Sequence, residues 1–378
     1  MQDADGKIVC LYGDTRENLY DKESALRKKV EDTIFRREHP TVAEYGKKWL
    51  MMRSSIVQHN TLQGYFQAMK RYILPVLGDM YMTDVTADDI RLAMLPVAKM
   101  SAATYGTVNM IIKSMFYSAE RSSLIEDNPA ARISARGGAR KRKRDALTDE
   151  QVKTLLDAIR DLPPYVFIMI GLYAGLRREE ILALQWDCVF LDASTPYISV
   201  RRAWRNVHNR PDISTRLKTP AAKRDIPIPH CLAECLWEAK EKSNSEYVIA
   251  SRDGGPLSES QFMNRWHHVR ERSTKERAYY TYINGQGIRH PIKLELGESP
   301  ANHNWIVCSI DFEVTPHVLR HTYITNLIYA GVDPKTVQYL AGHENSKVTM
   351  DIYAKVKYNK PEELGSVVNE ALKKTYKV

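Results

Sequence analysis

Residues 315–331 read TPHVLRHTYITNLIYAG, and the local signals in this stretch decide how the C-terminal part of the chain folds. Thr315 is a favourable N-cap, Pro316 suits the first position of a helix, and Gly331 suits the C-terminal end. The stretch therefore predicts one helix that begins just after Thr315 and closes at Gly331.

His317 and Arg320 give this predicted helix its chemistry. They are three residues apart, so they share a face near the positive end of the helix dipole, where an anionic phosphate is stabilised. The planar guanidinium of Arg320 can bind two non-bridging phosphate oxygens at once. Taken alone, however, an arginine on a helix is more commonly one half of a surface salt bridge.

Three further motifs contribute polar side chains. Arg177 follows a Gly-Leu turn in AGLRREEILAL, and Glu180 lies three residues later, where it can orient the guanidinium. Lys218 lies in RLKTPAAKRDIPIP, a segment between predicted strands. His343 follows a glycine in YLAGHEN, a position where a histidine is more commonly a capping or core residue.

Tyr353, in VTMDIYAKV, is the distinctive member of the set. A tyrosine hydroxyl has a pKa of about 10, so attack on phosphorus at neutral pH requires nearby cations or a base. Covalent attack would divide a difficult exchange into two easier steps and store the bond energy in a phosphotyrosine. Because the chain has 21 tyrosines, Tyr353 alone would carry little weight.

Composition limits the class of protein. A chain of 378 residues is long enough for roughly two or three domains. Lys and Arg (55) outnumber Asp and Glu (46), and the net charge of +9 favours a polyanionic partner. Five cysteines without CxxC spacing argue against a disulfide framework and a thiolate zinc site. Since no apolar run approaches the roughly 20 residues that span a bilayer and no signal peptide is evident, we expect a soluble, intracellular protein without a membrane partner.

The fold class predicted is mostly α with a small antiparallel β-sheet, that is, α+β. Residues 1–40 predict one strand and one helix, which either pack elsewhere or are the remnant of a larger N-terminal module. Residues 41–133 predict a compact helical domain, with helices capped by Thr41, by Asn60 or Thr61 (a helix over residues 62–78) and by Thr86. Residues 134–146 predict a basic linker, and residues 147–378 a larger domain with a C-terminal tail. Residues 273–314 read as an irregular insertion.

Basic side chains in two of these segments are candidates for DNA binding. Those in the helical domain either face DNA or are ordinary solvated charges. The linker is either disordered or lies as a strap along the phosphates. The candidates are Lys70, Arg71, Lys113, Arg140, Lys141, Arg142, Lys143 and Arg144.

Together the motifs resemble the tyrosine recombinase (phage integrase) family, most closely the integrases of conjugative transposons or phages. HVLRH and LAGH are similar to the family's HxLRH and LGH, a tyrosine follows His343 by ten residues, and AGLRREE is similar to the TGLR-type turn. The resemblance covers about residues 41–365 and implies a SAM-like core-binding domain followed by a catalytic domain. Residues 1–40 resemble only the last strand and helix of the family's N-terminal arm-type domain.

The resemblance implies a role for each site residue. Arg177 and Arg320 would bind the scissile phosphate, and Glu180 would support them. Lys218 would protonate the leaving 5′-oxygen, His317 would transfer a proton, and His343 would hydrogen-bond the phosphate. Tyr353 would form a 3′-phosphotyrosine link without metal, nucleotide or other cofactor. The implied activity is site-specific DNA strand breakage and rejoining, as in integration, excision or transposition.

Several alternatives remain open on the sequence. A Xer-like resolving recombinase and a type IB topoisomerase would use the same residues, and a non-catalytic DNA-binding protein could retain the fold. A metal hydrolase would use His317 and His321, four residues apart, with His343 as a third ligand; however, HVLRH lacks the glutamate of HExxH.

The resemblance also implies partners. These are double-stranded DNA at the element ends and target site, a homotetramer on synapsed DNA, an excisionase and a host DNA-bending protein. The tail after Tyr353 predicts a linker broken by proline and a short helix, which would dock either on a neighbouring protomer or on its own domain.

Overall fold

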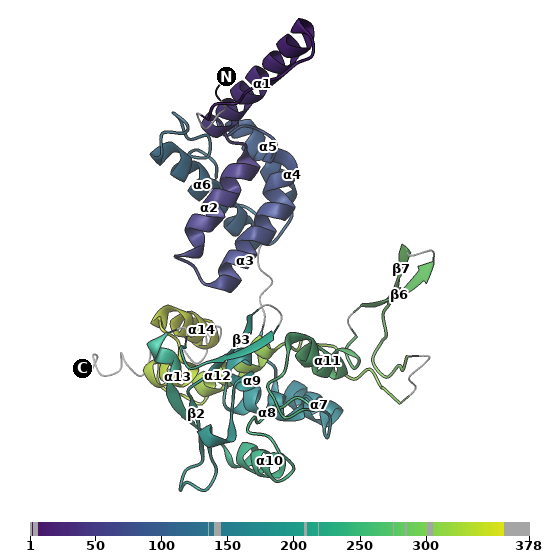
Figure 1. Cartoon of the computed structure of the whole chain (residues 1–378). Coiled ribbons are helices and arrows are strands. Elements are labelled where there is room, and N and C mark those ends of the chain that lie inside the picture. Colours follow the sequence, from purple (N-terminus) through teal and green to yellow (C-terminus); the bar gives the residue numbers. More distant parts are fainter. Residues whose placement is uncertain are drawn as a thin grey trace, which may run out of the picture. The chain divides into compact units, whose positions relative to one another are not determined.

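The structure, a computed structural model, divides the chain into two compact units, residues 1–143 and 144–378 (Figure 1). It describes residues 2, 7–134, 136–139, 145–207, 210–217, 219–274, 276–283, 286–300 and 305–358. Helices dominate and the strands form small antiparallel sheets, so the predicted α+β class is confirmed.

In the described part of the first unit, every named element is a helix. Its core is formed by buried side chains from several helices, among them Trp49, Ile73, Ile111 and Phe116. The elements are α1 (Arg16–Glu38), α2 (Val42–Ser54), α3 (His59–Ala68), η1 (Met69–Ile73), α4 (Leu74–Leu77), α5 (Ala87–Ala98) and α6 (Ala102–Arg121).

Helix starts in this unit follow their capping residues. Thr41 caps α2 and Thr86 caps α5, each in a capping box with the acidic residue three positions later, as the sequence predicts. The predicted N-cap of α3, Asn60 or Thr61, is wrong by two or three residues: the N-cap is Gln58, which makes no side-chain cap.

One helix predicted as regular over residues 62–78 contains a π-helical turn. Met69–Ile73 form η1 between α3 and α4, and Pro75 follows directly. Proline lacks an N–H group and its ring clashes with the carbonyl four residues earlier, so a regular α-helix is disfavoured here. Lys70 and Arg71 lie on this turn and are exposed.

The strand predicted near the N-terminus is not formed in the described residues. Gln2 and Ile8 make only an isolated bridge, and a lone strand has no partner to complete its ladder. The helix predicted after it is present as α1, capped by Thr15.

In its described residues, the second unit combines helices with three small sheets. Strands β1, β2 and β5 form an antiparallel sheet in that order, and β3–β4 and β6–β7 form separate hairpins. The elements are α7 (Asp149–Ile159), α8 (Tyr165–Tyr173), α9 (Arg178–Leu182), η2 (Trp186–Cys188), β1 (Val189–Phe190), β2 (Tyr197–Val200), β3 (Ala203–Val207), β4 (Arg210–Ser214), η3 (Pro220–Ala222), β5 (Arg224–Pro227), α10 (His230–Glu241), α11 (Glu259–Arg270), β6 (Arg277–Ile283), β7 (Gln286–Ile292), α12 (Pro316–Tyr329), α13 (Pro334–Ala341) and α14 (Ser346–Tyr358).

The close packing of α12 on α8 fixes the helix that carries His317 and Arg320. Gly171 of α8 lies against Leu319, because a Cβ at Gly171 would lie 2.9 Å from Leu319 Cδ1. Thr315 caps α12, as the sequence predicts. Helix α13 is capped by Asp333, and Gly342 ends it with φ +59° in the left-handed region that favours glycine.

The insertion over residues 273–314 is not irregular throughout, contrary to expectation. Strands β6 and β7 pair along their length as an antiparallel hairpin. At its base, Ser273 and Ile310 form a parallel bridge, which returns the chain to the start of α12. None of the described helices is long and apolar enough to cross a membrane.

Candidate active site

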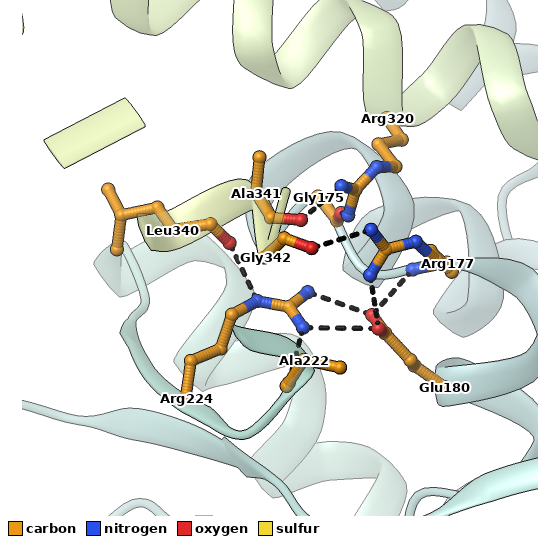
Figure 2. Close-up of polar contacts among 9 residues, drawn as sticks. All are labelled: Gly175, Arg177, Glu180, Ala222, Arg224, Arg320, Leu340, Ala341 and Gly342. Atoms are coloured by element: carbon orange, nitrogen blue, oxygen red, sulfur yellow. Dashed lines mark hydrogen bonds and ion pairs between the residues drawn. The ribbon is translucent and has the colours of Figure 1, made fainter. Parts of the chain in front are cut away.

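The site is organised around the buried carboxylate of Glu180. Arg177 is the N-cap of α9, and its backbone N–H and Nη1 donate to Glu180 at 2.9 and 2.8 Å. From β5, Arg224 donates Nη1 and Nη2 to the same carboxylate at 3.1 and 2.8 Å. Figure 2 shows both guanidinium groups converging on Glu180.

The charge of Glu180 is stabilised against its burial. Its side chain is only 4% exposed, and burial by itself would raise the carboxyl pKa. The charge and hydrogen bonds of Arg224, followed by the charges of Arg177 and Arg320, outweigh this effect and lower the pKa to about 2. Glu180 is therefore ionised at neutral pH and holds the cations in place.

Arg320 is the second buried cation of the site. Its Nη1 donates to the Gly175 carbonyl oxygen at 2.6 Å, and its Nη2 donates to the Ala341 carbonyl oxygen. Burial first, and then the nearby charge of Arg177, lower the pKa of Arg320 to about 9. That value still leaves the guanidinium protonated at neutral pH.

Three consecutive carbonyl groups at the end of α13 each accept a hydrogen bond from a different arginine (Figure 2). Arg224 Nε donates to Leu340 at 2.8 Å, Arg320 donates to Ala341, and Arg177 Nη2 donates to Gly342 at 2.7 Å. The last carbonyls of a helix have no intrahelical partner, so these arginines satisfy groups that would otherwise need water. The segment just before His343 is thereby tied to α9, α12 and β5.

His343 lies beside these arginines as a half-buried, neutral imidazole. Its Nδ1 is 2.9 Å from the hydroxyl of Thr349, which is fully buried in α14. Burial, followed by the charges of Arg320 and Arg177, lowers the pKa of His343 to about 4. The ring is thus uncharged at neutral pH, with one nitrogen able to donate a hydrogen bond and the other able to accept one.

His317 occupies the exposed first turn of α12. It lies three residues before Arg320 on the same helix, and an electrostatic interaction with it contributes, after burial and the arginines, to the lowered pKa of His343.

Tyr353 lies on α14, half-buried beside a small apolar cluster from α12 and α13. Helices α12, α13 and α14 pack on one another, so the tyrosine and Arg320 are carried by adjoining helices. The cluster against which Tyr353 packs consists of Tyr323, Ile324, Ile328, Val337 and Ala341.

Some predicted site residues are not assessed by the structure. Lys218 lies outside the described residues, as do the linker cations 140–144 and the tail 359–378. In the first unit, Lys70 and Arg71 are exposed, whereas Lys113 on α6 is half-buried.

Arg224 is the site residue that sequence reasoning missed. None of the sequence motifs singles it out, yet its side chain is completely buried, with 0% exposure. A signal was available: Arg224 and Ile226 occupy the two inward positions of β5, whose burial alternates. An arginine at an inward strand position requires buried acceptors, and these are Glu180 and the Leu340 carbonyl.

Two family models match the chain in agreement with this geometry. The model described as the phage integrase family matches residues 145–309 and 308–360. The model of the phage integrase N-terminal SAM-like domain matches residues 41–93. The chain belongs to the phage integrase family. This confirms the resemblance seen in the sequence motifs, and it makes the fold of the second unit that of a tyrosine recombinase catalytic domain.

Individual relatives differ in how much of the chain they match. An integrase of Streptomyces ambofaciens is 24% identical over 323 residues, 83% of this chain and 76% of the relative. The transposase from transposon Tn916 of Enterococcus faecalis is 51% identical, but over 41 residues only, 11% of this chain and 10% of the relative.

Solved structures share the fold at low sequence identity. The Tn1549 transposon integrase in complex with a circular intermediate DNA has a TM-score of 0.64 at 20% identity, covering 86% of this chain and 99% of that one. A lambda integrase tetramer bound to a Holliday junction has a TM-score of 0.56 at 18% identity, covering 91% and 92%.

Proposed function

We propose that this protein is the site-specific DNA recombinase of a mobile genetic element, and that it cleaves and rejoins DNA strands through a 3′-phosphotyrosine formed by Tyr353. The observation that carries the proposal is the convergence of Arg177 and Arg320, from separate elements, on the backbone beside His343. Membership of the phage integrase family supports the same activity.

Transfer of a phosphoryl group depends mainly on fixed positive charge around the phosphate. A phosphoryl group in transition carries its charge on non-bridging oxygens, and preorganised donors stabilise that charge. Arg177 and Arg320 would supply these donors by exchanging carbonyl oxygens for phosphate oxygens. The ion pair with Glu180 would keep Arg177 oriented during the exchange.

The remaining roles concern protons and hydrogen bonds. Neutral His343 would hydrogen-bond the phosphate, and exposed His317 would transfer a proton. Lys218 would protonate the leaving 5′-oxygen. Tyr353 would attack from α14, with the cations of the site favouring its ionised form. We assign no metal, nucleotide or other cofactor to the reaction.

The relatives favour an integrase over a resolving recombinase. The integrase of Streptomyces ambofaciens covers most of the chain, and the fold is shared with the Tn1549 transposon integrase. By analogy with the DNA-bound lambda integrase tetramer, this protein would act as a homotetramer on synapsed duplexes. Its setting would be the cytoplasm of a bacterium, with an excisionase and a host DNA-bending protein as further partners.

Basic side chains of the first unit and of the linker would bind DNA. Lys70 and Arg71 present exposed charge on the first unit, and Lys113 and the linker cations 140–144 complete the proposed set. These side chains would bind phosphates and would not read the base sequence.

A suicide-substrate assay tests the proposal. A nicked duplex carrying the terminal DNA of the element that bears the gene is incubated, without metal, with the wild type or with Tyr353→Phe. Wild type is expected to give a covalent protein–DNA band on a denaturing gel, and the variant none. Binding of this DNA without a covalent band from the wild type would contradict the proposal and favour a non-catalytic DNA-binding protein.

A further inference from the structure

We infer that Arg224 is a positioning residue that couples the Arg177–Glu180 pair to the end of α13. The end of α13 leads directly into His343 and then into α14. This inference rests on the proposed function, because it concerns how the same site is held in register.

The guanidinium of Arg224 is committed in three directions at once (Figure 2). Nε donates to the Leu340 carbonyl oxygen at 2.8 Å, Nη2 donates to Glu180 at 2.8 Å, and Nη1 is shared between Glu180 at 3.1 Å and the Ala222 carbonyl oxygen at 2.9 Å. Since the side chain is 0% exposed and all three of its nitrogens donate to protein oxygens, it is not placed to bind phosphate itself. Its action must pass through the groups that it holds.

Gly342 makes the coupling geometric as well as electrostatic. A Cβ at this position would lie 2.8 Å from Arg224 Nη1 and 3.0 Å from its Cζ, so the backbone before His343 rests directly on the guanidinium. The positive φ of +59° independently favours glycine. The carbonyl of the same residue accepts from Arg177 at 2.7 Å. A shift of the Arg224 guanidinium therefore moves the backbone of Gly342 and, through the Gly342 carbonyl, the guanidinium of Arg177.

Positive charge alone does not reproduce this arrangement. A lysine ammonium is a compact charge on a flexible stem, and it lacks the planar fork that reaches a carboxylate and a helix carbonyl together. Misplacement of reacting groups by about 1 Å can cost on the order of 100-fold in rate. Arg224→Lys is therefore expected to slow the chemical step while leaving the exposed DNA-binding cations unchanged.

The test compares Arg224→Lys with Arg202→Lys in the full-length protein. Arg202 forms a two-point ion pair with Asp187 at 2.8 and 2.7 Å on the same unit, so the control makes the same chemical change elsewhere. Covalent complex formation on the nicked duplex is measured in single turnover at saturating enzyme, and DNA affinity is measured separately. We expect Arg224→Lys to reduce the cleavage rate by about 10- to 100-fold and to change DNA affinity by less than about threefold, with both values near wild type in the control.

A second variant approaches the contact from the other side. Gly342→Ala should show the same loss of rate with retained binding, because its methyl group displaces the Arg224 guanidinium. The double variant Arg224→Lys/Gly342→Ala should be no slower than the slower single variant, since both substitutions disturb one contact. If Arg224→Lys does not fold, Gly342→Ala alone tests whether this contact positions the site.

The outcomes separate the two levels of inference. Absence of a covalent complex from the wild type contradicts the proposed function itself. A wild-type complex together with unchanged rates in Arg224→Lys and Gly342→Ala overturns the positioning role alone. Equal losses of rate and DNA affinity would make Arg224 a structural residue and also overturn it.

Discussion

Glu180→Gln offers a test of the buried charge cluster that needs no DNA. The folded-state pKa of this carboxyl is about 2, against an ordinary value of 4.5. By linkage, a shift of this size corresponds to about 3 kcal/mol of stability at neutral pH. Glutamine keeps the shape of the side chain but removes the charge that Arg177 and Arg224 share, so we expect the free energy of unfolding to fall by about 3 kcal/mol at pH 7.

The pH dependence follows from the direction of the shift. A folded-state pKa below the ordinary value means that the stabilisation is complete above about pH 5 and is lost as the pH falls toward 2. Near pH 3 about 2 kcal/mol of the stabilisation should already be gone. The difference between wild type and Glu180→Gln should therefore shrink on acidification, whereas other carboxyl groups titrate equally in both proteins.

The measurement is urea denaturation followed by tryptophan fluorescence between pH 3 and pH 7. Glu179→Gln is the matched control: its side chain is 44% exposed and pairs with Arg178 on the surface, so we expect a change below about 1 kcal/mol. A Glu180→Gln penalty as small as the control's, or a penalty that stays constant across this pH range, would refute the reasoning.

Three further predictions concern His343 and the first unit. Thr349→Val removes the hydroxyl that lies against His343 Nδ1, so the cleavage rate should fall by about tenfold while DNA affinity is retained; an unchanged single-turnover rate would show that the hydroxyl does not orient the ring. Because the pKa of His343 is lowered to about 4, protonation of this imidazole should not limit the rate between pH 6 and pH 8. Replacing both Lys70 and Arg71 by alanine should reduce the slope of log affinity against log salt by about 2 and leave the cleavage rate at saturation unchanged; an unaltered slope would remove them from the DNA-binding surface.

Local signals made much of the fold predictable. Thr41, Thr86 and Thr315 each cap a helix because a capping residue acts on backbone groups within one turn of itself. The motifs likewise identified Arg177 and Arg320, which the structure brings together.

The features that were missed depend on distant partners or on backbone adjustments. Arg224 acquires its importance from Glu180, 44 residues earlier, and from Leu340, 116 residues later. Neither separation leaves a periodic trace in the sequence. The hairpin of β6 and β7 was read as irregular because its tyrosines, glycines and prolines do not alternate in polarity.

The π-helical turn at Met69–Ile73 determines which face of α4 points toward the core of the first unit. Such a turn contains about one residue more than an α-helical turn, and each residue advances a helix by roughly 100°. The faces before and after the turn are therefore rotated relative to one another by about that angle. Loss of a single residue within the turn would let the helix run regularly, but it would swing the apolar face of α4, with Leu77, away from the core that Trp49 and Ile73 share with it. The turn thus sets the rotation of α4 relative to α3, and Lys70 and Arg71 lie on the turn itself.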